Sequence, residues 1–232
     1  MPMRIMPMPS GKIFERLQSL PLFQGLSHAD LSAIVETTRF DFRTIAAGQT
    51  IVNADTPCTH LFIVMNGHVE VTTRSDNRSY SLSEQLAAPL QLELERLFGL
   101  RQSYTRTVKA LEECQVLVIE KQAVMRISAE HLIVRINLLN TMATNSQRSQ
   151  RQPWRPSPET LAGRIVRFVE QHALRPAGPK TLSIKMQQLA YELNDSRIDV
   201  STALHELHDR GLVSLGRGHI FFPALEEALR NG

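Results

Sequence analysis

The sequence lacks the features that mark several classes of protein. It contains only two cysteines, Cys58 and Cys114, among 232 residues. Two thiols make no disulfide framework, and they cannot supply the four thiolates of an ordinary iron–sulfur cluster. No segment approaches the ~18 consecutive apolar residues that cross a bilayer, so we expect no membrane segment. The first residues hold no apolar stretch of about seven or more, so we expect no signal peptide and a cytoplasmic location.

The sequence also lacks a strong charge of one sign and the motifs of common enzymes. With 26 Lys and Arg against 23 Asp and Glu, its net charge is +3, so an argument for nucleic-acid binding must come from local patterns. It contains no Walker loop and no GxGxxG, HExxH or GxSxG motif. We therefore predict no catalytic residue, no metal site and no enzymatic activity.

The middle of the chain, residues 38–120, has mostly the alternation of β-strands. The apolar run 61–65 is followed by Asn66 and Gly67 and then by a second alternating run. Asn-Gly between such runs predicts a β-hairpin with a type I′ turn, whose two central residues need positive φ. The stretch 83–100 breaks the alternation and is expected to be partly helical. Many short strands separated by turn signals predict a β-sandwich or roll.

Helical spacing flanks this region on both sides. Residues 14–37 are predicted to be helical, and Ser27 with Asp30 has the spacing of a capping box. A second helical region is predicted over residues 121–152. Within it, four residues repeat at spacings of 4, 3 and 4, as the a and d positions of a coiled coil do; they are Leu132, Ile136, Leu139 and Ala143.

This repeat has two interpretations. Either the helix packs on the protein's own core, or the four residues form a homodimer interface. We favour the interface, because the β region before the helix looks complete without it and because the helix becomes polar toward its end. Three prolines within 153–158 then end the helix and stiffen the chain. Ser157 is expected to cap the next helix, with Pro158 at its first position.

Residues 186–205, MQQLAYELNDSRIDVSTALH, have the pattern of a helix-turn-helix. Ala190 is small enough for two helices to cross closely. Asn194 tolerates the positive φ that the turn between the helices requires. Val200 is the apolar residue that holds the second helix against the first.

Ser196 is predicted to cap the second helix, with Asp199 three residues later. The start of this helix is then exposed, as it is where a helix-turn-helix enters the major groove. Arg197 can give a bidentate contact to guanine O6 and N7. The predicted DNA-contacting residues of the helix are Ser196, Arg197, Ile198, Ser201 and Thr202.

Two short strands around Gly216-Arg217-Gly218 predict a β-hairpin wing. Arg217 at its tip can reach a phosphate, and residues 181–184 can pair as a third strand. A helix, a helix-turn-helix and a wing in this order make a winged helix.

With these elements in place, the chain resembles the Crp/Fnr family of bacterial transcription regulators over nearly its full length. The resemblance begins at PLFQGLS (21–27), continues through LFIVMNGHVEV (61–71) and ends in the winged helix-turn-helix. It implies an α+β fold with an N-terminal double-stranded β-roll (jelly-roll-like) and flanking helices, a long dimerisation helix and a C-terminal winged helix-turn-helix. We assign these parts to residues 14–120, 121–152 and 153–232. Family members bind two-fold-symmetric operators as homodimers, and an effector in the roll reorients their DNA-binding heads.

The first departure from the family lies in the roll. Members that bind cyclic AMP carry a Gly-Glu pair and then Arg-Ser or Arg-Thr, where the arginine pairs with the cyclic phosphate. Aligned on Ala110, this chain has Tyr104 and Thr105 in those places, and the Gly-Glu pair is absent. We therefore disfavour cyclic AMP and keep three alternatives: a pocket filled by side chains, a different small ligand, or a cyclic nucleotide held by a displaced arginine. The candidate effector pocket consists of Leu100, Arg101, Tyr104, Thr105 and Arg106.

The second departure lies in the recognition helix. Ile198 stands where many members have a glutamate that accepts from cytosine, and Thr202 stands where they have an arginine. Ile198 can touch a thymine methyl group instead, so we expect an operator that differs from the familiar half-sites.

The histidines carry weaker signals. Some family members sense gases through haem held by His or Cys, which makes His60, His68 and Cys58 candidate ligands, with ordinary strand and loop roles as the alternative. His205 and His208, at i and i+3, are expected to lie on the surface or to contact phosphate.

We predict a homodimeric, sequence-specific DNA-binding transcription regulator. Its expected partners are double-stranded DNA, a second copy of the chain, RNA polymerase and an unknown small-molecule effector. One alternative is a sensor of a cyclic nucleotide or, through haem, of a gas. The other is a protein-interaction adaptor that keeps the fold without specific DNA binding; the presence of Ser196, Arg197 and Arg217 argues against it.

Overall fold

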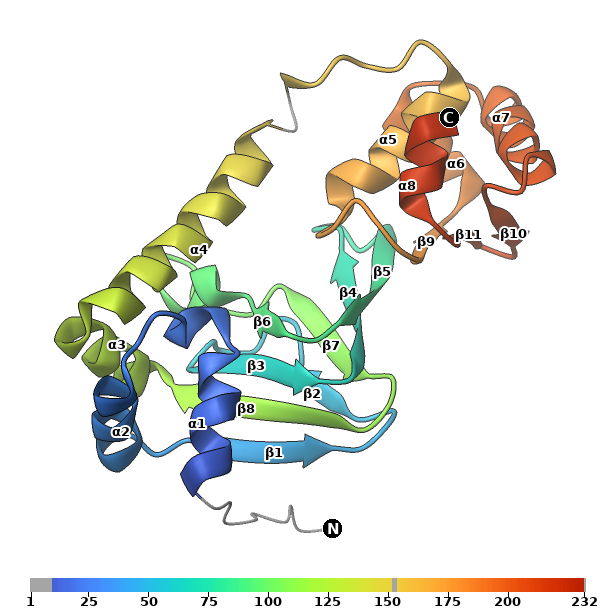
Figure 1. The fold of residues 1–232 in the computed structure, drawn as a ribbon. Coiled ribbons are helices and arrows are strands. Elements are labelled where there is room, and N and C mark those ends of the chain that lie inside the picture. The colour runs from blue at the N-terminus through green and yellow to red at the C-terminus, as the bar shows by residue number, and fades with distance from the viewer. Residues whose placement is uncertain (1–9, 152–153, 232) are drawn as a thin grey trace. The chain divides into compact units, whose positions relative to one another are not determined.

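The computed structural model describes residues 10–151 and 154–231. Its contacts divide the chain into two compact units (Figure 1). The first unit consists of Met1–Val69, Ala87–Thr105 and Lys109–Arg151, and the second of Glu70–Leu86, Arg106–Val108 and Gln152–Gly232. Helices and antiparallel sheets are mixed in sequence order, so the predicted α+β class is correct. The predicted boundary at Gln152 and Pro153 falls outside the described residues, and the functional division into three parts stays a prediction.

The first unit begins with two helices and a short turn between them. They are α1 (Ser10–Gln18), the 3-10 helix η1 (Pro21–Phe23) and α2 (His28–Thr37). The predicted capping box is confirmed, because Asp30 N donates to Ser27 Oγ at 3.1 Å and Ser27 N donates to the Asp30 carboxylate. The continuous helix expected over 14–37 is interrupted, since Pro21 starts a separate turn and Gly25 follows at φ +84°.

A four-stranded antiparallel sheet forms the centre of the first unit. Its order is β1 (Asp41–Ile45), β8 (Cys114–Glu120), β3 (His60–Asn66) and β6 (Leu90–Leu92), as Figure 1 shows. In the β3–β8 ladder, Ile63 lies opposite Leu117, and both are fully buried. The unit also contains β2 (Thr50–Val52), which follows Gly48 at φ +80°. The alternation of residues in this region predicts both β2 and β8.

The hairpin predicted at Asn66-Gly67 is wrong. The strand after this pair, β4 (His68–Arg74), does not pair with β3; its neighbours are β5 (Tyr80–Ala87) and β7 (Arg106–Ala110) in a different sheet. A type I′ turn needs positive φ at two residues, but only Gly67 has it, at +99°. A Cβ on Gly67 would lie 2.7 Å from Cys114 Sγ. Glycine is therefore required here for a close backbone approach, and the chain changes sheet instead of folding back.

The stretch 83–100, which was expected to be partly helical, contains both helix and strand. It contains the end of β5, all of β6 and one short 3-10 helix, η2 (Leu94–Leu97). In β5 the buried positions alternate as Leu82, Glu84 and Leu86. A carboxylate at a buried position conceals the apolar alternation, which explains why the pattern was missed.

Two helices occupy the region predicted as 121–152. They are α3 (Lys121–Glu130) and α4 (Leu132–Arg151), and the chain leaves helical geometry at His131 between them. Val134 and Leu138 of α4 are buried in the first unit. No helix among the residues described is both long enough and apolar enough to span a membrane.

The second unit contains the C-terminal elements in the predicted order. They are α5 (Leu161–His172), β9 (Lys180–Ile184), α6 (Met186–Leu193), α7 (Arg197–Asp209), β10 (Ser214–Gly216), β11 (His219–Phe222) and α8 (Leu225–Asn231). The N-cap of α5 is Thr160, whose side chain accepts from Gly163 N, and not Ser157 as expected. The predicted third strand is confirmed, since β9 pairs with β11.

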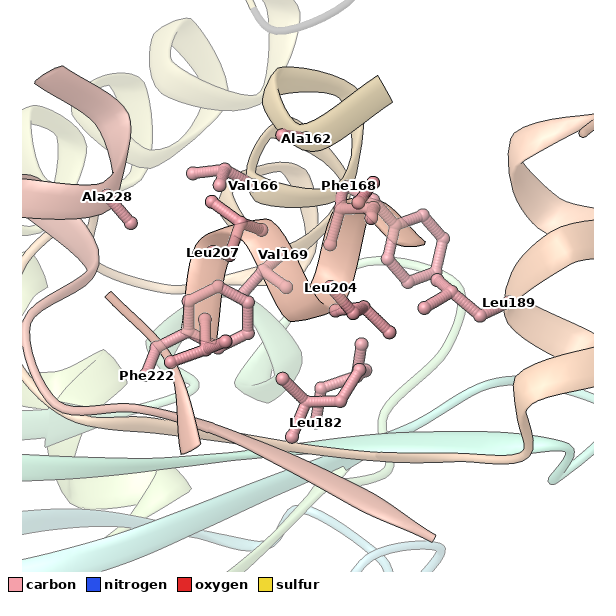
Figure 2. Close-up of a cluster of buried hydrophobic side chains, with 14 of the residues drawn as sticks. Ala162, Val166, Phe168, Val169, Leu182, Leu189, Leu204, Leu207, Phe222 and Ala228 are labelled. Carbon is pink, nitrogen blue, oxygen red and sulfur yellow. The ribbon is translucent and has the colours of Figure 1, made fainter. Parts of the chain in front are cut away.

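Strand β5 also belongs to this unit. It pairs antiparallel with the other edge of β9, from Tyr80 opposite Ile184 to Glu84 opposite Lys180. Leu82 joins the buried cluster that α5, α6, α7 and α8 share, part of which is drawn in Figure 2. The core of the unit is thus completed by a strand that lies some hundred residues earlier in the chain.

A buried ion pair crosses the β5–β9 ladder. Lys180 Nζ lies 3.5 Å from Glu84 Oε1, and both side chains are 0% exposed. Glu84 also accepts from the backbone N–H groups of Leu174 and Arg175, while Lys180 donates to the carbonyls of Ala177 and Gly178. Burial lowers the pKa of Lys180, and the Glu84 carboxylate opposes that shift.

Breaking this pair should destabilise the protein strongly. We expect Lys180→Met to lower the free energy of unfolding by about 3–5 kcal/mol, because it leaves the Glu84 carboxylate buried without its cation. Glu84→Gln should cost a similar amount, since it leaves the ammonium group uncompensated. The double variant should lose less than the sum of the two single losses. Urea unfolding of the four proteins measures the coupling, and additive losses would show that the two charges do not depend on each other.

Candidate nucleic-acid interface

Helix α7 is fixed by one apolar face. Val200, Leu204 and Leu207 are fully buried and pack in one cluster with Leu189 of α6 and Phe168 of α5 (Figure 2). Each large apolar side chain contributes roughly 1.5–3 kcal/mol when it is removed from water. The two predicted helices are therefore present and packed together, and their packing determines which face of α7 is left exposed.

The turn between α6 and α7 has the predicted left-handed residue. Asn194 adopts φ +50° and ψ +51°, and its N–H donates to the carbonyls of Ala190 and Tyr191. Asparagine tolerates this region better than most residues with a side chain. Ala190 is 5% exposed, in agreement with the close helix crossing expected there.

Arg164 of α5 holds the turn from the other side. Its guanidinium lies 2.5 Å from the Asp195 carboxylate and also donates to the carbonyl of Leu193. A backbone hydrogen bond from Ser196 and the Arg164 contact keep the pKa of Asp195 below its usual value. Sequence reasoning missed Arg164, because its partners lie about thirty residues away and no local pattern indicates them.

Ser196 caps α7 as predicted. Asp199 N donates to Ser196 Oγ at 3.1 Å, and Ser196 Oγ donates to the Asp199 carboxylate at 2.7 Å. The hydrogen bond satisfies one of the unpaired N–H groups of the first turn, that of Asp199, and fixes the start of the helix. Arg197 is consequently the first residue of α7 and is exposed.

Most of the predicted DNA-contacting residues of α7 share one face. Arg197, Ile198, Ser201, Thr202 and His205 line a shallow hollow on the surface of the second unit. Ile198 is 77% exposed, which is unusual for a large apolar side chain in a packed helix. His205 belongs to the face as well, although it was expected only to lie on the surface or contact phosphate.

The wing is present beside the helix-turn-helix. Strands β10 and β11 pair from Ser214 opposite Phe221 to Gly216 opposite His219. Arg217 lies at the tip and is exposed, and Gly218 supplies the positive φ of the turn at +78°. An arginine at this place can contact a phosphate, and such a contact does not distinguish one DNA sequence from another.

The 4-3-4 repeat of α4 is exposed in the single chain. Leu132 is 63% exposed, Ile136 45% and Leu139 60%, and Ala143 is exposed as well. Val134 and Leu138, on the opposite side of the helix, are the residues that pack on the protein's own core. The four residues of the repeat are therefore available to a partner. The residues of α4 that pack on the chain's own core are different ones.

In the candidate effector pocket, Tyr104 and Thr105 turn inward. Tyr104 is 4% exposed and its hydroxyl donates to the carbonyl of His60. Burial raises the pKa of Tyr104, so this phenol is uncharged. Thr105 donates its N–H and its hydroxyl to the carboxylate of Glu93, the N–H at 2.8 Å. The structure thus brings these two residues together with Glu93.

Glu93 is the residue of this pocket that sequence reasoning missed. It is 7% exposed and has a left-handed backbone at φ +42°, which is uncommon for a residue with a side chain. The other pocket candidates differ in exposure: Leu100 and Arg101 face solvent, and Arg106 is half-buried. The absence of the Gly-Glu pair can be read from the sequence. The contact between Glu93 and the Thr105 donors can be seen only in the folded structure.

The candidate haem ligands do not form one site. His60 is the first residue of β3 and His68 the first residue of β4, so the length of β3, about 20 Å, lies between them in the chain. His68 Nδ1 is 2.6 Å from Glu112 Oε1, and the Cys58 thiol is 2% exposed with its pKa raised by burial. In the part of the chain that the structure describes, no three His, Cys, Asp or Glu side chains gather as metal ligands do.

Comparisons with known proteins agree with this architecture. Residues 42–131 match the family model of the cyclic nucleotide-binding domain. A Eubacterium rectale protein assigned to the Crp/Fnr transcriptional regulators has a similar structure, with 21% identity, a TM-score of 0.52 and coverage of 91% of this chain and 98% of its own. The sensor domain of the transcriptional regulator DNR from Pseudomonas aeruginosa has 19% identity and a TM-score of 0.51, and covers 65% of this chain and 96% of its own. No curated protein matches the chain.

These matches establish the fold. The resemblance to Crp/Fnr regulators is confirmed by the domain match and by the structural neighbours, which are transcription regulators. At identities near 20%, the neighbours carry over an architecture but no residue roles.

Cyclic AMP should not bind this chain. A cyclic phosphate buried in a roll needs a paired cation, but Tyr104 is neutral and the donors of Thr105 are already held by the Glu93 carboxylate. Glu93→Gln should not restore binding, because it removes a negative charge without adding a positive one. Isothermal calorimetry with cyclic AMP and cyclic GMP checks both proteins. A dissociation constant near 10 μM, about −7 kcal/mol, would show that another arginine pairs with the phosphate.

Proposed function

We propose that the chain is a sequence-specific DNA-binding transcription regulator that acts as a homodimer on a two-fold-symmetric operator. The observation that carries the proposal is the exposed face of α7, where Arg197 and Ile198 begin a capped helix beside a wing. A winged helix reads DNA by placing such a face in the major groove. The regulator fold of the whole chain supports the same conclusion.

The roles of the two exposed arginines follow from their positions. Arg197 lies at the start of the recognition helix, where base edges are reached, and Arg217 lies at the tip of the wing, where phosphates are reached. Ser196, Ser201 and Thr202 extend the first set. With DNA as the ligand, the chain acts in the cytoplasm with RNA polymerase as a partner, and the roll senses a small molecule other than cyclic AMP.

The sensor and adaptor alternatives explain less of the chain. The sensor alternative does not account for the exposed Ile198 and Arg197, since the packing of α7 does not need either side chain. The adaptor alternative does not account for the second exposed arginine, Arg217, at the tip of a wing. Recovery of bound DNA from a random pool tests the proposal against both. Enrichment of a palindromic sequence supports a specific regulator, and a pool without enrichment would contradict it.

Arg197→Ala should relax specificity, while Arg217→Ala should weaken binding to all sequences equally. We expect the first variant to lose roughly 1–3 kcal/mol on the selected site and to tolerate any base pair at one position of each half-site. The second should reduce the slope of affinity against salt, because one phosphate contact is lost. Fluorescence anisotropy on specific and scrambled DNA at several salt concentrations separates the two effects. Equal loss of specificity in both variants would refute the two roles.

Ile136→Asp should dissociate the homodimer. It would place one carboxylate of each subunit in an apolar interface, which costs several kcal/mol per ion. Because Ile136 is 45% exposed in the single chain, the variant should fold normally, so its thermal unfolding is the control. Analytical ultracentrifugation should show a dimeric wild type and a monomeric variant with weaker operator binding. A monomeric wild type at micromolar concentration would exclude this interface.

A further inference from the structure

The hydrogen bonds of the α7 face determine what its last residues can offer to DNA. His205 Nδ1 lies 2.7 Å from the carbonyl oxygen of Ser201. A carbonyl oxygen only accepts, so Nδ1 carries the hydrogen. The neutral imidazole then has its lone pair at Nε2, the ring nitrogen that is left for a ligand. His205 therefore presents an acceptor and not a donor.

Thr202 is committed in the same way. Its hydroxyl donates to the carbonyl of Ile198 at 3.1 Å, so the lone pairs of Oγ1 remain for an incoming donor. Arg197, at the other end of the face, has a guanidinium that only donates. The face is thus divided along the helix: donors at the start of α7, an apolar side chain at Ile198, and acceptors at Thr202 and His205.

A phosphate does not match the acceptor end, because phosphate oxygens are acceptors too. In the major groove the complementary groups are amino groups, N6 of adenine and N4 of cytosine, whereas guanine N7 and O6 match the donor end. His205 lies eight positions after Arg197, a distance of about 12 Å along the helix axis. At ~3.4 Å per base pair, this distance corresponds to about three or four base-pair steps.

We propose that His205 is a specificity-determining residue that accepts a hydrogen bond from the amino group of an adenine or a cytosine in the operator. The inference rests on the proposed function and adds to it a second direct base contact, placed two helical turns after Arg197. Each half-site then carries a guanine for Arg197 and, about three or four base pairs away, an adenine or cytosine for His205.

The test is selection of DNA from a random pool with the full chain at pH 8, above the ordinary range of imidazole pKa values. Wild type, His205→Lys, His205→Gln and the control His68→Ala are compared, each checked for folding by thermal unfolding. His68 is exposed on the β-roll, where it pairs with Glu112. We expect the control to select the wild-type sequence.

His205→Lys replaces an acceptor by a donor. It should change the preference at one position of each half-site from adenine or cytosine to guanine or thymine, and bind the wild-type site roughly tenfold more weakly. His205→Gln should keep adenine, because an amide offers an acceptor and a donor together.

Three outcomes would overturn the inference. An unchanged sequence for both His205 variants would mean that the residue contacts no base. A uniform loss or gain of affinity on all sequences, with a changed salt dependence, would assign it to phosphate. A wild type that enriches no sequence would remove the proposed function together with this inference, whereas the first two outcomes leave the proposed function intact.

Discussion

The turn between α6 and α7 is the constraint on which the proposed DNA-reading face depends. Asn194 must hold a left-handed backbone for α7 to leave α6 in the observed direction. Arg164 ties the two residues on either side of it, through the Leu193 carbonyl and the Asp195 carboxylate, to α5. Because the turn is fixed at both flanks, the burial of Val200 and Leu204 determines the rotation of α7. This rotation determines which residues of α7 are exposed, and the exposed residues themselves do not contribute to it.

The sequence predicts such features where the physical cause is local. Ser196 and Asp199 are three residues apart, so the cap that the Ser196 side chain gives to Asp199 N is visible in the sequence. Asn194 stands at the turn position that needs positive φ. The hairpin at Asn66-Gly67 failed for the opposite reason. The local signal was sound, but Gly67 is required because Cys114 from another strand packs against its Cα. A glycine required for a close approach between distant residues gives the same sequence pattern as a glycine required for a turn. Only the folded structure distinguishes the two cases.

The β-roll combines a matched domain fold with a local arrangement of side chains that the match does not specify. The domain match covers residues 42–131, and Tyr104, which the sequence comparison sets against the arginine of cyclic-AMP-binding members, is buried. The Thr105 donors are occupied by Glu93, an anion of the chain itself. The Glu93 carboxylate beside these donors repels an anionic phosphate at this place in the roll. The strand content of this region was predictable from its alternation, whereas the contact between Glu93 and the Thr105 donors depends on a backbone conformation at Glu93 that no motif indicates.

The second unit also shows why its extent could not be read from the sequence. Its C-terminal elements have local signals, but its sheet includes β5, and Leu82 of that strand lies in the shared core. Tyr80 donates toward His172 Nε2 at 3.0 Å, and Glu84 is buried against Lys180. A buried carboxylate is costly without a cation beside it, so Glu84 at this position of β5 depends on Lys180 of β9. Strands that pair across about a hundred residues leave little local signal in the sequence. The one local sign is Glu84, which stands where the alternation predicts an apolar residue, and its meaning is clear only when Lys180 is known to be its partner.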